Sequence, residues 1–161
     1  MLFRSGVQMV CLDSNGPAEV PRGNIVPEQL EWLDTADEAS LAPFGGKTAL
    51  EKMMLKAAQA TCDFYIEHTP VDGVPYWDTG APNLHKLGDY LDRPADPFND
   101  FEPVDSSAAA IGAQGLLRLG KYLSDKGNAA AGEKYVQAGL KVVDTLLEEP
   151  YLSTDEKHQG L

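Results

Sequence analysis

The sequence predicts an all-α protein whose helices form a layered toroid rather than an isolated bundle. Three segments carry apolar residues at helical spacing, and the apolar face of each segment is wide. Short turns would join these helices on one side and long loops on the other, which suits such a toroid. We therefore expect about three long helices, an irregular N-terminal segment and a long acidic loop.

Residues 1–46 are expected to form an irregular segment that packs on the helices. Four prolines and scattered glycines within residues 12–46 allow only short elements, such as one helical turn over Pro27–Leu33. The apolar residues here indicate packing on the rest of the protein rather than a free linker: Ile25, Val26, Leu30, Trp32 and Leu33. The helical domain is then expected to span residues 47–161.

The first long helix is predicted to begin at Thr48. Thr48 and Glu51 have the spacing of a capping box, in which hydroxyl and carboxylate satisfy backbone amides reciprocally. Pro70 should end the helix just after His68. Its apolar stripe follows the helical period: Leu50, Met53, Met54, Ala57, Ala58, Thr61, Phe64 and Tyr65.

A turn, an extended stretch and a long loop should follow this helix. Asp72-Gly73 is typical of a turn, and Val74–Asp78 is expected to be extended because the residue before a proline avoids helical angles. The segment from Gly80 to Pro103 reads as a long surface loop. It combines prolines with four aspartates: Asp89, Asp92, Asp96 and Asp100.

Two further helices are expected after the loop. Asp105 is a good N-cap because its carboxylate can accept hydrogen bonds from the free amides of a first helical turn. That helix should run to about Ser124, with Gly127 just past its end. The last helix should span about Ala129–Glu148. A stripe of small residues on the second helix would let another helix approach closely: Ala108, Gly112, Gly115 and Leu119.

The charge of the chain limits its partners. It has 25 acidic and 13 basic residues, a formal net charge of −12, which repels phosphate backbones and anionic lipid surfaces. Nucleic acid and membrane are therefore not expected as partners. An anionic sugar would also be repelled at long range, so its binding would need local basic or donor groups.

The cysteines and histidines signal no metal site, and no cofactor is expected. Cys11 and Cys62 form no Cys-x-x-Cys pair, which favours two free thiols over a zinc site or a disulfide. His68, His85 and His158 are widely scattered. No apolar run approaches the length of a membrane span, and the chain as given has no signal-peptide pattern, so we expect a soluble protein.

Tyr76, Trp77, Asp78 and Asp105 are the candidate binding residues. An aromatic ring beside a carboxylate suits a sugar, because rings stack on apolar sugar faces and acids accept bonds from hydroxyl groups. Alternatives remain open. Trp77 could be a buried tryptophan with its indole donor satisfied, and Asp105 could be only a helix cap.

Two motifs and their neighbours resemble the unsaturated glucuronyl hydrolases, glycoside hydrolase family 88, in particular the unsaturated chondroitin disaccharide hydrolases. The resemblance covers about Leu50 to Leu123. Its residues are Asp72-Gly73-Val74-Pro75-Tyr76-Trp77-Asp78, Pro82, Asp105-Ser106-Ser107-Ala108-Ala109-Ala110-Ile111 and Gly115-Leu116-Leu117. The chain departs from the family at Val104, where arginine is common, and in a longer acidic loop.

The resemblance implies an (α/α)6 barrel of six helical hairpins, of which residues 47–161 would be a C-terminal-half part. Such enzymes protonate the enol-ether double bond of a terminal 4,5-unsaturated uronic acid and add water, and the hydrated sugar then opens and releases its neighbour. No metal or organic cofactor is implied. The family's acid/base aspartates and its Arg-Gly-Gln-Ala-Trp stretch have no match here, so we assign no catalytic residue and expect the chain alone to be nearly inactive.

Two other functions remain open from the sequence. One is a non-catalytic helical repeat module that binds a partner. The other is a different toroid enzyme, similar to the rhamnogalacturonyl hydrolases. A partial barrel would meet the rest of the barrel, or associate with itself, through exposed apolar faces. The parent enzyme would be cytoplasmic or periplasmic.

Overall fold

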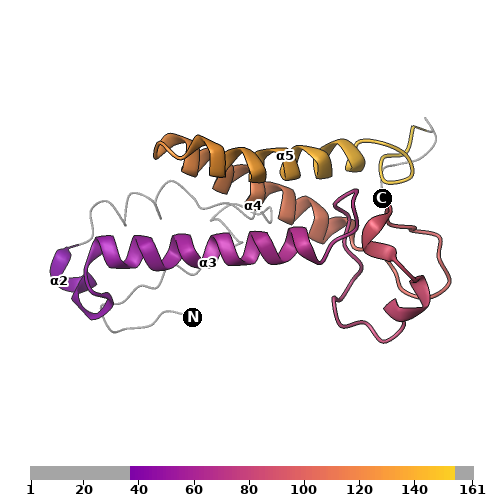
Figure 1. Cartoon of the computed structure of the whole chain (residues 1–161), viewed down its shortest axis with the longest axis horizontal. Helices are drawn as coiled ribbons and strands as arrows, with labels where there is room; N and C mark the ends of the chain where they lie inside the picture. Colours follow the sequence, from indigo (N-terminus) through magenta and orange to yellow (C-terminus); the bar gives the residue numbers. More distant parts are fainter. Residues whose placement is uncertain (1–36, 155–161) are drawn as a thin grey trace, which may run out of the picture. The chain divides into compact units, whose positions relative to one another are not determined.

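The computed structural model describes residues 37–154 of the chain (Figure 1). The predictions for Cys11, for His158 and for the apolar residues between Ile25 and Leu33 lie outside these residues. The described chain contains α-helices and short 3-10 helices, and within it the one β-type pairing is an isolated bridge. The predicted all-α class is confirmed, and the helices are consistent with a fragment of a helical toroid.

The chain falls into two compact units, Met1–Ala57 and Ala58–Leu161, whose boundary lies inside helix α3 (Lys47–Glu67). The described part of the first unit contains helix α2, the 3-10 helix η1 and the start of α3. The second unit contains the end of α3, the acidic loop and helices α4 and α5. The domain boundary expected after residue 46 stays a prediction.

In the first unit, a short helix precedes α3. Helix α2 (Glu38–Leu41) begins after Asp37, whose side chain accepts a hydrogen bond from the Ala39 amide. It passes into η1 (Ala42–Phe44). Of the proline-rich region expected to hold only short elements, these residues are the part that the structure describes, and the elements there are short.

Helix α3 begins at Lys47, one residue earlier than predicted. The Lys47 amide donates to Glu38 Oε1 at 3.4 Å, and the Leu50 amide donates to the Gly46 carbonyl at 3.1 Å. Thr48 therefore lies inside the first turn, so its prediction as the cap was wrong. The acceptor comes from α2, a helix that the capping-box pattern could not reveal.

Helices α4 (Ser106–Asp125) and α5 (Ala129–Leu146) form an antiparallel hairpin, and they lie side by side in Figure 1. Gly127 joins them with a φ of +85°, its amide donating to the carbonyl of Ser124, and the Asn128 amide donates to the carbonyl of Leu123. This is a Schellman motif, whose left-handed residue favours glycine. The predicted position of Gly127 is confirmed, whereas α5 ends two residues earlier than expected.

Glycines allow α4 and α5 to approach closely, but not those that the sequence indicated. A Cβ atom built on Gly132 would lie 2.5 Å from the carbonyl oxygen of Gly120. Of the predicted stripe, Gly112 does meet another helix, because its Cβ position lies 2.6 Å from the Tyr65 ring of α3, whereas Gly115 has no atom within 4 Å of its Cβ position. The hairpin thus depends on Gly120 and Gly132.

The segment between Gly80 and Pro103 has a core of its own, so its prediction as a plain surface loop was incomplete. It contains two 3-10 helices, η2 (Leu84–Leu87) and η3 (Tyr90–Asp92). Its buried residues pack together with partly buried neighbours: Tyr76, Ala81, Leu84 and Leu87, with Tyr90, Ala95 and Val104. The acidic side chains lie outside this cluster, which fixes the shape of the loop.

No helix among residues 37–154 combines the length and the apolar character that crossing a membrane requires.

Candidate functional site

The backbone brings the two motif segments together. Tyr76 and Val104 form an antiparallel bridge. On either side of it, the Trp77 amide donates to the Pro103 carbonyl at 3.0 Å and the Asp105 amide donates to the Pro75 carbonyl at 2.8 Å. The Tyr-Trp-Asp segment therefore lies directly beside the start of α4, although more than 25 residues separate them in sequence.

The turn before this segment is docked on two helices. Gly73 has a φ of +82°, and its carbonyl accepts a hydrogen bond from the Tyr65 hydroxyl of α3 at 2.7 Å. The Thr145 hydroxyl of α5 donates to the Asp72 carbonyl at 2.8 Å. The Asp72 carboxylate accepts from the Ala95 amide at 2.9 Å, which ties the acidic loop to the same turn. The turn predicted at Asp72-Gly73 is confirmed.

Trp77 combines a fixed indole with an exposed ring. Its Nε1–H donates to Glu102 Oε2 at 2.6 Å, and the other oxygen of this carboxylate accepts from the Asn83 amide at 2.7 Å. The Trp77 side chain is nevertheless 52% exposed. The indole is thus satisfied as in a core tryptophan, while part of its face stays open to solvent.

Glu102 is almost fully buried, yet its environment favours the charged form. The hydrogen bond from the Trp77 indole holds the pKa of the Glu102 carboxyl below its usual value, and this outweighs the opposing effect of burial. The Asn83 amide and the positive charge of Lys86 lower the pKa further. A carboxylate that accepts two hydrogen bonds at low solvent exposure is a strong local tie for the loop.

We predict that the Trp77 indole resonance will titrate with Glu102. Because the folded pKa is lowered, the charged tie stabilises the fold above the ordinary glutamate pKa of about 4.3. This stabilisation is lost only as the pH falls through the lower folded value. In ¹H–¹⁵N spectra, the Trp77 Nε1–H signal, assigned with Trp77→Phe, should stay constant down to that range and move below it. Glu102→Gln should abolish the movement, and a midpoint at or above the ordinary value would contradict the tie.

The two aspartates of the motifs have local structural bonds. Asp78 Oδ1 accepts from the Gly80 amide at 2.7 Å and the side chain is exposed. Asp105 caps α4, as predicted: its Oδ1 accepts from the Ser107 hydroxyl at 2.6 Å and from the Ala108 amide at 2.8 Å. These bonds, that of Ser107 first, hold the pKa of the Asp105 carboxyl below its usual value.

Tyr76 is buried beneath the site. Its ring meets that of Tyr90 edge-on, with centroids 5.6 Å apart, and its hydroxyl accepts from the Asp96 amide at 3.4 Å. Of the four candidate residues, Trp77 and Asp78 are therefore the exposed pair, and Tyr76 and Asp105 lie in supporting positions.

The sequence analysis missed Glu102. One signal could have revealed it: Phe101-Glu102 repeats the order of aromatic and acid seen in Trp77-Asp78, next to a proline at the end of the loop. The distance of 25 residues from Trp77 hid the pairing.

A second polar cluster ties α3 to α5 inside the second unit. Asp63 Oδ1 accepts from Lys134 Nζ at 2.7 Å and from the Tyr135 hydroxyl at 2.9 Å. The bond from Lys134, followed by that from Tyr135, lowers the pKa of the Asp63 carboxyl. Burial raises the pKa of Tyr135 to about 12, so its hydroxyl stays a donor. Every member has a partner, which indicates a structural role.

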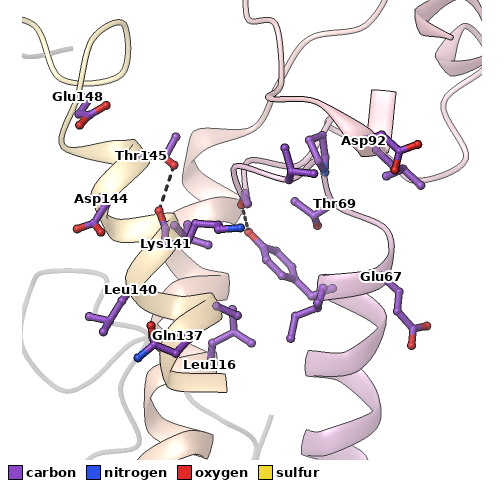
Figure 2. A pocket seen from close by; sticks show the side chains of 18 residues that line it. Glu67, Thr69, Asp92, Leu116, Gln137, Leu140, Lys141, Asp144, Thr145 and Glu148 are labelled. Carbon is purple, nitrogen blue, oxygen red and sulfur yellow. Dashed lines mark hydrogen bonds between the residues drawn. The ribbon is translucent and has the colours of Figure 1, made fainter. Parts of the chain in front are cut away.

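A cleft of about 920 Å³ opens between the ends of α3 and α5. Figure 2 shows side chains of α5 along one wall and Glu67 of α3 on the other. Four carboxylates line it against one ammonium group: Glu67, Asp92, Asp144 and Glu148, with Lys141. This charge disfavours an anionic ligand, and none of the four candidate residues belongs to the described lining. We therefore place the candidate site at Trp77.

Within residues 37–154, no three His, Cys, Asp or Glu side chains gather in a way that could hold a metal ion.

Comparison with known proteins gives one informative similarity. The chain is 35% identical over 103 residues to the unsaturated glucuronyl hydrolase of Formosa agariphila, an alignment that covers 63% of this chain and 20% of that protein. The chain therefore corresponds to about a fifth of the length of this curated relative. No protein-family model matches the chain. No solved structure matches it significantly. The relative supports the resemblance to the unsaturated glucuronyl hydrolases that the two motifs indicate.

Proposed function

We propose that the chain is part of a glycoside hydrolase that acts on unsaturated uronyl oligosaccharides. The similarity to the Formosa agariphila protein supports this reaction class. The reaction would hydrate the terminal 4,5-unsaturated uronic acid in polysaccharide degradation, after which the hydrated sugar opens and releases its neighbour. In this proposal the chain supplies a substrate-binding surface.

The geometry of Trp77 is the observation that carries the binding role. Its indole is held at 2.6 Å by Glu102 while about half of the side chain remains exposed. A ring that is fixed in place can stack on the apolar face of a sugar with little further loss of conformational freedom. Asp78 follows directly, so a carboxylate lies beside the ring to accept hydrogen bonds from sugar hydroxyl groups.

Tyr76 and Asp105 would act beneath this surface. Tyr76 fills the core of the loop, and Asp105 fixes the start of α4 against the Pro75 carbonyl. We propose that they contribute to binding by holding the Trp77-Asp78 segment in position.

The proton for the reaction would come from residues outside this chain. The lowered pKa of Asp105 keeps it ionised near neutral pH, which makes it a poor proton donor. Asp78 already accepts from the Gly80 amide and shares no hydrogen bond with a second carboxylate among the described residues. The chain would thus bind sugar without turning it over.

Exposed apolar side chains support the proposal that these helices belong to a larger ring. In the first unit, Met53 on α3 is 56% exposed. In the second unit, Ile111 on α4 and Leu147 after α5 are 71% and 62% exposed. Large apolar groups on long helices are typical of surfaces that other helices cover. The same groups would allow self-association.

The test is to measure binding and turnover with the purified chain. A 4,5-unsaturated uronyl disaccharide should bind weakly, and its ultraviolet absorbance should not decay. Trp77→Ala should weaken binding by about 2- to 10-fold, the loss of one stacking contact of about 0.5–1.5 kcal/mol. Tyr122→Ala, which removes an exposed ring on α4, serves as the control and should change nothing.

Two results would oppose the proposal. Rapid loss of absorbance would show that the chain does hold the acid and base. Equal binding by the parent chain and by Trp77→Ala would show that the Trp77 ring does not bind the sugar.

A further inference from the structure

A lysine lies next to the Trp77 surface. Lys86 Nζ is 5.6 Å from the centroid of the Phe101 ring, and Phe101 adjoins the carboxylate that holds Trp77. The Lys86 amide donates to the Asn83 carbonyl at 2.8 Å, while the Asn83 amide donates to Glu102. Glu102 therefore holds Trp77 directly and is linked to Lys86 through the backbone of Asn83, and Phe101 precedes Glu102 in the sequence.

The backbone around Lys86 is well fixed. Lys86 lies in η2, and its neighbours Leu84 and Leu87 in this 3-10 helix are both buried in the core of the loop. Lys86 itself is exposed, as are Phe101 at 44% and Trp77 at 52%. Two partly open aromatic rings and one ammonium group thus stand on a rigid base.

The charges nearby single out Lys86. Residues 79–101 hold four aspartates and only two strong bases, Lys86 and Arg93. The Arg93 guanidinium donates to the Leu87 carbonyl inside the loop. Glu102, whose pKa the positive charge of Lys86 helps to lower, already accepts from Trp77 and Asn83. Lys86 is therefore the base placed to meet an outside anion.

We propose that Lys86 selects an anionic sugar at this surface, its ammonium group pairing with the carboxylate of a uronic acid that stacks on Trp77 or Phe101. The inference rests on the proposed function and deepens it, because it names the residue that recognises the carboxylate of the sugar. A local cation is also required on electrostatic grounds, because the net charge of −12 repels an anionic sugar at long range.

The test compares two ligands that differ in charge and have nearly the same shape. One is the unsulfated 4,5-unsaturated uronyl disaccharide, and the other is its methyl ester, which has nearly the same shape and no carboxylate. Binding to the purified chain is measured by calorimetry at low salt. The acid should bind about 2- to 5-fold more tightly than the ester, as expected for one exposed ion pair. Lys86→Gln should remove this preference and leave binding of the ester unchanged.

Lys126→Gln is the matched control. Lys126 Nζ lies 5.4 Å from the Tyr122 ring, so the variant removes the same charge from the same kind of contact elsewhere. It should keep the preference for the acid.

Each outcome has a distinct meaning. If Lys86→Gln keeps the preference, or if the parent chain binds acid and ester equally, the role of Lys86 is overturned. The proposed binding of sugar by Trp77 would still stand after that result, provided that Trp77→Ala weakens binding of both ligands. If Trp77→Ala has no effect, or if neither ligand binds, the proposed function fails together with this inference.

Discussion

Gly132→Val should strongly destabilise the hairpin of α4 and α5. A Cβ at this position would lie 2.5 Å from the carbonyl oxygen of Gly120 and 2.5 Å from the Ser124 hydroxyl oxygen. The Gly120 oxygen is backbone, so the helices must separate to make room. We expect a loss of about 3 kcal/mol or more in the free energy of unfolding, at the upper end of overpacking costs. Urea unfolding followed by circular dichroism at 222 nm would measure it.

Gly115→Ala on α4 is the control for this substitution. Nothing lies within 4 Å of its Cβ position. Alanine is a better helix former than glycine, so the variant should gain about 0.5–1 kcal/mol. Valine at residue 132 would also gain helix propensity, which means that any loss comes from the contact itself. A loss below about 1 kcal/mol for Gly132→Val would contradict the close approach.

Gly73→Ala should undock the turn that carries the Tyr-Trp-Asp segment. Two costs combine, because the φ of +82° disfavours a residue with a side chain and its Cβ would lie 2.5 Å from Val142 Cγ2. Val142 is 1% exposed, so its side chain has nowhere to turn. The strain of the left-handed backbone is about 1–2 kcal/mol. With the steric contact, the total loss should reach about 3 kcal/mol in the same unfolding measurement.

A double-mutant cycle separates these two costs. In a Val142→Ala background the clashing methyl group is absent, so Gly73→Ala should cost only the backbone strain of about 1–2 kcal/mol. Equal costs in both backgrounds would show that Gly73 does not lie against the Val142 side chain. The Trp77 indole signal offers a second readout, since it should shift in Gly73→Ala if the turn moves.

The three long helices were predictable because apolar residues recur at helical spacing in each of them. The Asp105 cap and the Gly127 motif both depend on residues within a few positions, and the structure confirms both. The start of α3 was placed one residue late because Glu38, which belongs to another helix, accepts the bond from the Lys47 amide. Local patterns do not contain such partners.

The contacts between elements were harder to predict. Gly112 of the predicted small-residue stripe meets the Tyr65 ring of α3, yet the close approach of α4 and α5 uses Gly120 and Gly132, which lie outside the stripe. Choosing among several glycines requires the rotation of one helix about its axis, and apolar periodicity determines this only roughly when the apolar face is wide.

The sequence indicated Trp77 and Asp78 as candidate residues, but it did not indicate the contacts that hold them in place. Trp77 and Asp78 stand out as an aromatic beside an acid. The burial of Tyr76 and the bond from Trp77 to Glu102 depend on how the loop closes on itself, which involves residues up to 25 positions apart. Prolines and aspartates indicated irregular backbone, and they hid the few apolar residues that form its core.

The closed base of the acidic loop makes it a natural place for insertions. The Tyr76–Val104 bridge and the bond from Trp77 to Glu102 join its two ends. At Gly88 the backbone is exposed, and nothing lies within 4 Å of its Cβ position. Doubling the length of a flexible loop adds only about 0.6 kcal/mol of closure entropy. A peptide tag or reporter inserted after Gly88 would thus break one local hydrogen bond, from the Tyr90 amide to the Gly88 carbonyl, while the two ties at the base keep the ends of the loop together.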